Sequence, residues 1–160
     1  MIVRATNLET GKEFESVVDK LDKDFLRSMI NFDFGEHEIQ RVINNLNVSA
    51  DVKALLFKMT KVTMKVGDIV LKIGMKIMEF VCMIYKEYPN VTFGLIFGSI
   101  AGLLIGTIPL IGAVLGAVVT PILMAFGLLM GIKEDLSNKE LERKIAAANA
   151  KFNQLKTVSI

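Results

Sequence analysis

The sequence has almost none of the residues that build metal sites and nucleophilic catalytic sites. It contains one cysteine, Cys82, and one histidine, His37. A structural zinc ion needs four cysteine or histidine ligands, so this composition excludes one, and a lone cysteine forms no intrachain disulfide. None of the serines lies in a recognisable nucleophile motif, and no phosphate-binding glycine motif occurs. We therefore predict no enzyme activity, no cofactor and no metal site, and we expect His37 to be a surface residue.

Charge is missing from a long internal segment. Between Glu87 and Lys133 there are 45 residues without a single Asp, Glu, Lys or Arg, whereas about 20 apolar residues already suffice for a membrane-spanning helix. As one helix, residues 91–132 would extend roughly 63 Å, about twice the hydrocarbon thickness of a bilayer. Pro109 has no amide hydrogen and disfavours helix at the residue before it. The sequence therefore predicts a transmembrane hairpin over residues 91–132, with its turn near Pro109.

The two predicted arms of this hairpin differ in length. Residues 91–107 would form a helix of about 26 Å, and residues 110–132 one of about 34 Å. Pro121 lies in the middle of the second arm and predicts a kink there. The alternative is a hairpin buried entirely inside a soluble protein, in which case the rest of the chain would have to cover two helices that are apolar on all sides.

The flanks of the uncharged segment predict an orientation. The turn at residues 107–110 carries no charge, whereas Lys86 and Lys133 lie at the base of the hairpin. Positively charged flanks favour the cytoplasmic side. The N-terminus turns polar at once and does not resemble a secretory signal. We expect a multi-pass protein of the plasma or inner membrane with both termini cytoplasmic.

Residues 49–88 show the most regular pattern in the chain. Ser49 is a plausible N-cap and Pro89 a stop signal. Apolar residues between them recur at spacings of three and four, with one slip, as in a coiled-coil seam; they are Val52, Leu55, Met59, Val62, Val66, Ile69, Ile73, Ile77, Phe80 and Ile84. The pattern predicts one long amphipathic, coiled-coil-like helix over residues 49–88.

A polar stripe follows the opposite side of this predicted helix. Its candidate functional members are Lys65, Asp68, Lys72, Lys76 and Glu79. A stripe of this kind is either a solvated face or, if the helix lies at membrane depth, the lining of a water-filled path, because charged side chains in lipid are costly. The sequence leaves both interpretations open.

Shorter amphipathic helices are predicted on either side. Residues 1–48 contain two, at about 10–30 and 36–46, and residues 137–157 form a C-terminal helix that begins after Ser137. The C-terminal helix has an apolar stripe at spacings of four and three, formed by Leu141, Ile145, Ala148, Phe152 and Leu155. The predicted fold class is an all-α membrane protein whose central two-helix transmembrane hairpin is preceded by a long amphipathic helix.

Glycines in the uncharged segment recur at intervals of four. Four are consecutive in this spacing and two further pairs follow: Gly94, Gly98, Gly102 and Gly106, then Gly112 with Gly116, and Gly127 with Gly131. Glycine strips let helix backbones approach closely and drive helix association in lipid. They predict helix-packing faces, either between the two arms of the hairpin or between subunits of a homo-oligomer.

The hairpin over residues 91–132, rich in glycine and alanine and broken at Pro109, resembles the hydrophobic hairpin of colicin-type pore-forming domains in composition and layout. This resemblance implies membrane insertion and ion conduction. The functional hypothesis is a homo-oligomeric pore or channel in a lipid bilayer, lined by the polar stripe; the alternative is a non-conducting anchor, scaffold or subunit of a larger membrane complex. We expect no nucleic-acid partner, since the net charge is only +2 and acidic residues interleave the lysines.

Overall fold

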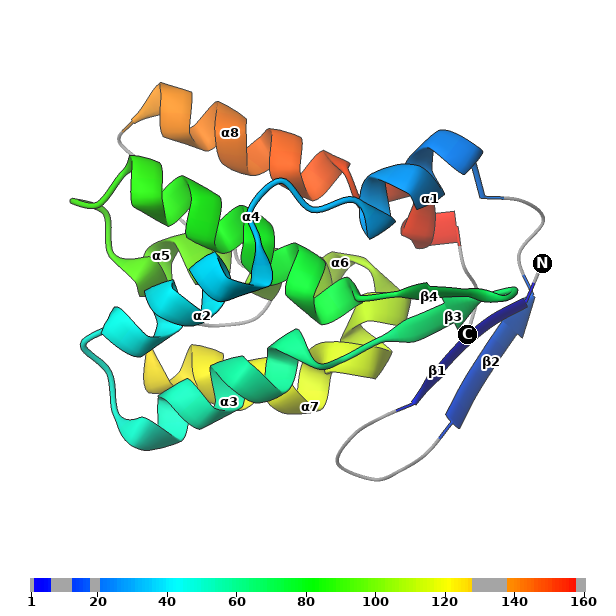
Figure 1. The fold of residues 1–160 in the computed structure, drawn as a ribbon, viewed down its shortest axis with the longest axis horizontal. Helices are drawn as coiled ribbons and strands as arrows, with labels where there is room; N and C mark the ends of the chain where they lie inside the picture. The colour runs from blue at the N-terminus through cyan, green and yellow to red at the C-terminus, as the bar shows by residue number, and fades with distance from the viewer. Residues whose placement is uncertain (1, 7–12, 18–20, 128–137, 158–160) are drawn as a thin grey trace.

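The strands of the protein gather at one end of a body built mainly of helices (Figure 1). The computed structural model describes residues 2–6, 13–17, 21–127 and 138–157. The strands are β1 (Ile2–Thr6), β2 (Glu13–Val17), β3 (Met64–Val66) and β4 (Ile69–Leu71). The helices are α1 (Lys23–Ile30), α2 (Glu36–Asn45), α3 (Ala50–Thr60), α4 (Ile73–Glu87), α5 (Phe93–Phe97), α6 (Leu103–Thr107), α7 (Pro109–Ala125) and α8 (Lys139–Ala150), with a π-helical turn η1 (Gly98–Gly102) and a 3₁₀ turn η2 (Asn153–Thr157). The predominance of helix agrees with the prediction, but the sheet shows that an all-α fold was wrong.

The sheet is antiparallel, with strand order β2-β1-β3-β4. In β1, Val3 and Ala5 are buried while their neighbours are exposed, as the two-residue period of a strand requires. Strands β3 and β4 are joined by the two-residue turn Gly67–Asp68, so that Val66 pairs with Ile69. Gly67 has φ +59° and occupies the first central position of this turn, where a positive φ matches the twist of the two strands.

The prediction of one long helix over residues 49–88 is wrong. Its ends are as predicted, since Ser49 Oγ accepts a hydrogen bond from Val52 N at 3.3 Å and α4 ends just before Pro89. Between them the chain forms α3, the β3–β4 hairpin and α4. The physical reason is local: Val62, Met64 and Val66 are buried at intervals of two, and the Gly67–Asp68 turn reverses the chain.

The predicted helix over residues 10–30 is also wrong, because β2 and α1 occupy the described parts of that range. Asp22 caps α1, with its side chain accepting from Asp24 N at 3.0 Å. The second N-terminal helix is confirmed as α2, which buries Ile39 and Ile43. The domain assigned to residues 1–48 therefore combines two strands of the sheet with two short helices.

The uncharged segment does form a helical hairpin. Elements α5, η1 and α6 run without interruption from Phe93 to Thr107, and α7 packs back against α6. The predicted turn is confirmed, since Ile108 is extended and Pro109 is the first residue of α7. Pro121 lies inside α7 without ending it. The end of the predicted second arm, from Leu128 to Ile132, falls outside the described residues. Within the described ranges, none of the helices is both long enough and apolar enough to cross a membrane.

Four elements cover this hairpin, and we call α3, α4, α8 and η2 the shell. Helix α3 and η2 contact α7, α4 contacts α5, and α8 contacts both α4 and η1. The side chain of Asn149 donates to the Ser99 carbonyl of the π-helical turn at 3.1 Å. The predicted stripe of the C-terminal helix is confirmed as buried, and the five residues are Leu141, Ile145, Ala148, Phe152 and Leu155. The helix itself is shorter than predicted, and Asn138 caps it by accepting from Glu140 N and Leu141 N; Ser137 lies outside the described residues.

Candidate functional site

Helix α7 is apolar on both of its faces. Its inner face is buried, and the outer face consists of small or apolar residues, which are Pro109, Ala113, Gly116, Ala117, Thr120, Pro121, Met124 and Ala125. Met124 is 72% exposed, the most exposed of the large hydrophobic side chains described. A helix at the surface of a water-exposed domain normally carries charge on its outer side. The outer face of α7 carries none, which suits contact with an apolar environment or another apolar helix.

Three of the predicted packing glycines lie between the arms of the hairpin. A Cβ atom at Gly94 would lie 2.8 Å from the ring of Phe126, and one at Gly102 would lie 3.2 Å from Leu123. At Gly112 a Cβ would lie 2.7 Å from the Ile105 carbonyl oxygen. The structure therefore places these glycines at contacts within one chain, where they allow close approach.

The other predicted packing glycines are placed differently. Gly98 is buried in η1, whereas Gly106 is exposed. A Cβ atom at Gly116, on the outer side of α7, would have no described neighbour within 4 Å. Gly127 follows the end of α7 with φ +73°, a usual way to terminate a helix; Gly131 lies outside the described residues. Gly106 and Gly116 remain available for contacts between copies.

Lys76 and Glu79 form a buried ion pair on α4. Their exposed fractions are 5% and 1%, and Lys76 Nζ donates to Glu79 Oε1 at 2.8 Å. The connection between α1 and α2 completes the site, because Lys76 Nζ also donates to the Asn31 carbonyl at 2.6 Å and Glu79 Oε2 accepts from Phe34 N at 3.0 Å. The ammonium group also lies 4.8 Å from the centroid of the Phe32 ring. This Lys76–Glu79 pair attaches residues 31–34 to α4.

The remaining residues of the predicted polar stripe are separated from this pair. Lys65 is exposed on β3, Asp68 is exposed in the β3–β4 turn, and Lys72 is exposed immediately before α4. The single stripe expected from a continuous helix is therefore absent from the described structure. A role of the five stripe residues in lining an ion path stays a prediction. It would require an arrangement of residues 65–79 other than the one described.

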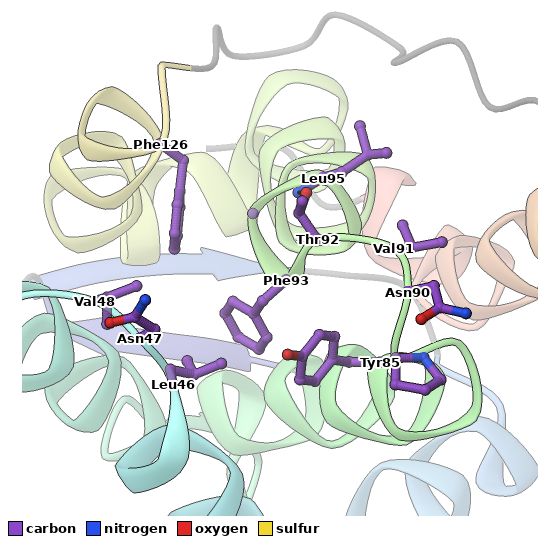
Figure 2. A pocket seen from close by; sticks show the side chains of 12 residues that line it. Leu46, Asn47, Val48, Tyr85, Asn90, Val91, Thr92, Phe93, Leu95 and Phe126 are labelled. Atoms are coloured by element: carbon purple, nitrogen blue, oxygen red, sulfur yellow. Dashed lines mark hydrogen bonds between the residues drawn. The ribbon is translucent and has the colours of Figure 1, made fainter.

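A cleft of about 630 Å³ lies at the base of the hairpin (Figure 2). Its lining comes from the α2–α3 connection at residues 46–48, from Tyr85, from residues 89–95 and from Phe126. Tyr85 and Phe93 pack edge to face with ring centroids 5.4 Å apart, and Phe93 lies 6.1 Å from Phe126. This site was not predictable from the sequence, because its residues come from segments that are far apart along the chain.

Cys82 lies on α4 inside the core, and we predict that its thiol is inert in the folded protein. Burial raises the pKa of Cys82 to about 12, and the thiolate is the reactive form. At pH 8 only about one thiol in ten thousand would be ionised. A maleimide reagent at pH 8 should leave the native chain unlabelled over an hour and label it fully in urea, as followed by mass spectrometry. Equal labelling rates in both conditions would contradict the buried position.

The other predicted features concern metals and His37. His37 is exposed on α2, as expected. In the part of the chain that the structure describes, no group of three His, Cys, Asp or Glu residues suits a metal ion.

No protein-family model, curated protein or solved structure matches this chain.

Proposed function

We propose that this chain is a membrane-inserting protein that transfers its apolar hairpin from the shell into a lipid bilayer, where copies assemble. The observation that carries the proposal is the outer face of α7, whose residues are exposed or half-buried and include no charged side chain. Association of copies would use the glycine and alanine positions of that face, because small residues allow helix backbones to approach closely in lipid.

The arrangement of the hairpin supports this proposal in a second way. The hairpin is one continuous segment of the chain, so its covalent connections to the rest of the protein lie at its two ends, Phe93 and Ala125. Of its covering helices, α3 and α4 precede the hairpin and are joined through strands β3 and β4, whereas α8 follows the hairpin in the chain. Separating the shell from the hairpin would break contacts between elements, among them the hydrogen bond from Asn149 to the Ser99 carbonyl, and would leave the backbone hydrogen bonds within the hairpin helices in place. In the bilayer, the arms would extend toward the predicted limits of residues 91–132 to match the hydrocarbon thickness.

We expect that Ala117→Lys blocks insertion without disturbing the described fold. Ala117 lies at the centre of α7 on its exposed face, so a lysine there should change the free energy of unfolding by no more than about 0.5 kcal/mol. At the centre of a membrane helix a lysine costs about 3 kcal/mol, which is roughly a hundredfold in partitioning. Co-flotation with phospholipid vesicles measures insertion, and maleimide labelling of Cys82 reports whether α4 leaves the hairpin.

The matched control for this experiment is Ala147→Lys, which adds the same charge to an exposed position of α8. It should leave flotation unchanged. If Ala117→Lys floats as well as the parent chain, or if the parent chain itself does not bind vesicles, membrane insertion of the hairpin is disproved.

Ion flux separates the two forms of the proposed function. A homo-oligomeric pore would release ions from vesicles that contain the inserted protein, whereas an anchor, scaffold or subunit of a larger complex would not. Lys76 and Glu79 are buried against residues 31–34, so they cannot line a water-filled path while α4 stays in this position. If the polar residues of α4 line the path, ion release should begin only after α4 has moved. Maleimide labelling of Cys82, which reports that movement, should therefore precede ion release.

A further inference from the structure

We propose that the cleft at the base of the hairpin binds an uncharged amphiphile with a single acyl chain, of the monoglyceride class. This binding site goes beyond membrane insertion, since it exists in the described fold without a bilayer. Its volume of about 630 Å³ lies within the range of small-molecule sites.

The charge of the lining selects the head group of the ligand. Every described residue that lines the cleft is uncharged, so a phosphate, carboxylate or ammonium group would lose its hydration there without gaining a partner of opposite charge among them. Burying an unpaired charge is far costlier than burying a neutral polar group. The cleft therefore favours a neutral head group over a charged one.

The walls of the cleft suit an acyl chain. Leu46 and Val48 come from the α2–α3 connection, while Val91 and Leu95 approach from the start of the hairpin (Figure 2). Phe93 and Phe126 lie between these walls, and the absence of a side chain at Gly94 leaves room for the ring of Phe126. Aliphatic and aromatic surfaces of this kind bind a hydrocarbon chain by burial of apolar area.

Polar groups occur at few positions of the lining. The side-chain amides of Asn47 and Asn90 each donate and accept hydrogen bonds, and both residues are exposed at the edge of the cleft. Figure 2 shows them on opposite sides of the Phe93 and Tyr85 rings. Amide groups at the edge of an apolar cleft can form hydrogen bonds with the hydroxyl and ester groups of a neutral amphiphile whose acyl chain lies in the cleft.

The cleft lies between the hairpin and the elements around it, so binding has a structural consequence. Phe93 and Phe126 belong to the two ends of the hairpin, whereas Leu46 and Tyr85 belong to elements outside it. A ligand that contacts both groups stabilises the packed arrangement over any form in which they separate. This consequence rests on the proposed function, but binding itself does not.

The experiment uses tyrosine fluorescence, because the chain has no tryptophan and only two tyrosines. Tyr88 is not part of the lining, so it can be replaced without changing the cleft. In a Tyr88→Phe background, Tyr85 in the cleft is then the sole strong fluorophore. The probe is 1-monolauroylglycerol below its aggregation concentration, without vesicles. We expect a saturable fluorescence change, and binding of laurate, which has the same chain length and a charged head, at least about tenfold weaker.

Two variants and one control test the location of the site. Val91→Phe fills the cleft and should weaken binding at least about tenfold, and Asn47→Leu removes an exposed amide from its edge and should weaken binding severalfold. Val70→Phe enlarges an exposed residue of β4 and should leave binding unchanged. Circular dichroism confirms folding, and Asn47→Leu remains informative if Val91→Phe does not fold.

The proposal is overturned if the parent chain shows no saturable response. It is also overturned if folded Val91→Phe and Asn47→Leu both bind like the parent, or if laurate binds as tightly as the monoglyceride. Failure of vesicle flotation together with intact monoglyceride binding would instead disprove the proposed function alone.

Discussion

Replacing Lys76 with methionine is expected to lower the free energy of unfolding by about 3–5 kcal/mol. The substitution keeps the length and apolar character of the side-chain stem but removes the ammonium group. Glu79, with an exposed fraction of 1%, would then keep its hydrogen bond from Phe34 N but lose the charge that balances its carboxylate. A buried carboxylate without a counter-charge is one of the few causes of such a large effect. Urea denaturation followed by far-ultraviolet circular dichroism measures it.

A double variant separates the cost of breaking the pair from the value of having it. In Lys76→Met/Glu79→Gln the charge is gone from both positions, while the amide oxygen at position 79 still accepts from Phe34 N. Replacing both members of a buried pair is often nearly neutral, so most of the stability should return. The surface control is Lys72→Met, at an exposed lysine one turn earlier, for which the expected change is within about 0.5 kcal/mol. If Lys76→Met were no more destabilising than Lys72→Met, the buried pair would be disproved.

The parts of the fold that were predictable have a local cause. In α8 and η2 a single apolar stripe, from Leu141 to Leu155, is enough to say which side is buried. The ends of the region at 49–88 were predictable for the same reason, because Ser49 and Pro89 act on the backbone within one helical turn. The turn of the hairpin at Pro109 is a further local effect.

The sheet was missed because its strands depend on distant partners. Strand β1 is five residues long and pairs with β3 through Val3 and Val66, which are far apart in the sequence. In β3 and β4 the apolar residues satisfied a helical spacing and a two-residue spacing at once. The turn Gly67–Asp68 was the one local signal that favoured a hairpin.

The polar stripe on α4 was interpretable in two ways for a related reason. Its lysines and Glu79 resemble a solvated face, and no local pattern reveals that residues 31–34 cover part of it. The backbone carbonyl of Asn31 and the amide of Phe34 make burial of the Lys76–Glu79 pair possible. The cleft at the base of the hairpin was unpredictable for the same reason, since Leu46, Phe93 and Phe126 come together only in the folded chain.

Gly74 was not singled out from the sequence, although the structure gives it a tighter contact than Gly94, Gly102 or Gly112. It lies in the first turn of α4, where that helix crosses the end of α3. A Cβ atom at position 74 would lie 1.9 Å from the Met59 carbonyl oxygen and 3.3 Å from the Cβ of Val62. The obstacle at Met59 is backbone, and Gly74 N also donates to the Val62 carbonyl at 3.1 Å. A methyl group therefore has no flexible neighbour to displace.

We expect Gly74→Ala to lower the free energy of unfolding by about 3 kcal/mol or more, because overpacking against fixed backbone forces the two helices apart. The matched control is Gly116→Ala on α7, where no described residue from outside that stretch of helix lies within 4 Å of the added methyl. Alanine is favoured over glycine inside a helix by about 1 kcal/mol, so this control should be neutral or slightly stabilising. Urea denaturation of both variants measures the difference. Because α3 contacts α7 and α4 contacts α5, loosening the crossing at Gly74 should also expose Cys82 to maleimide at pH 8. Similar stabilities for the two variants, with Cys82 protected in both, would show that α3 and α4 do not cross at Gly74 as described.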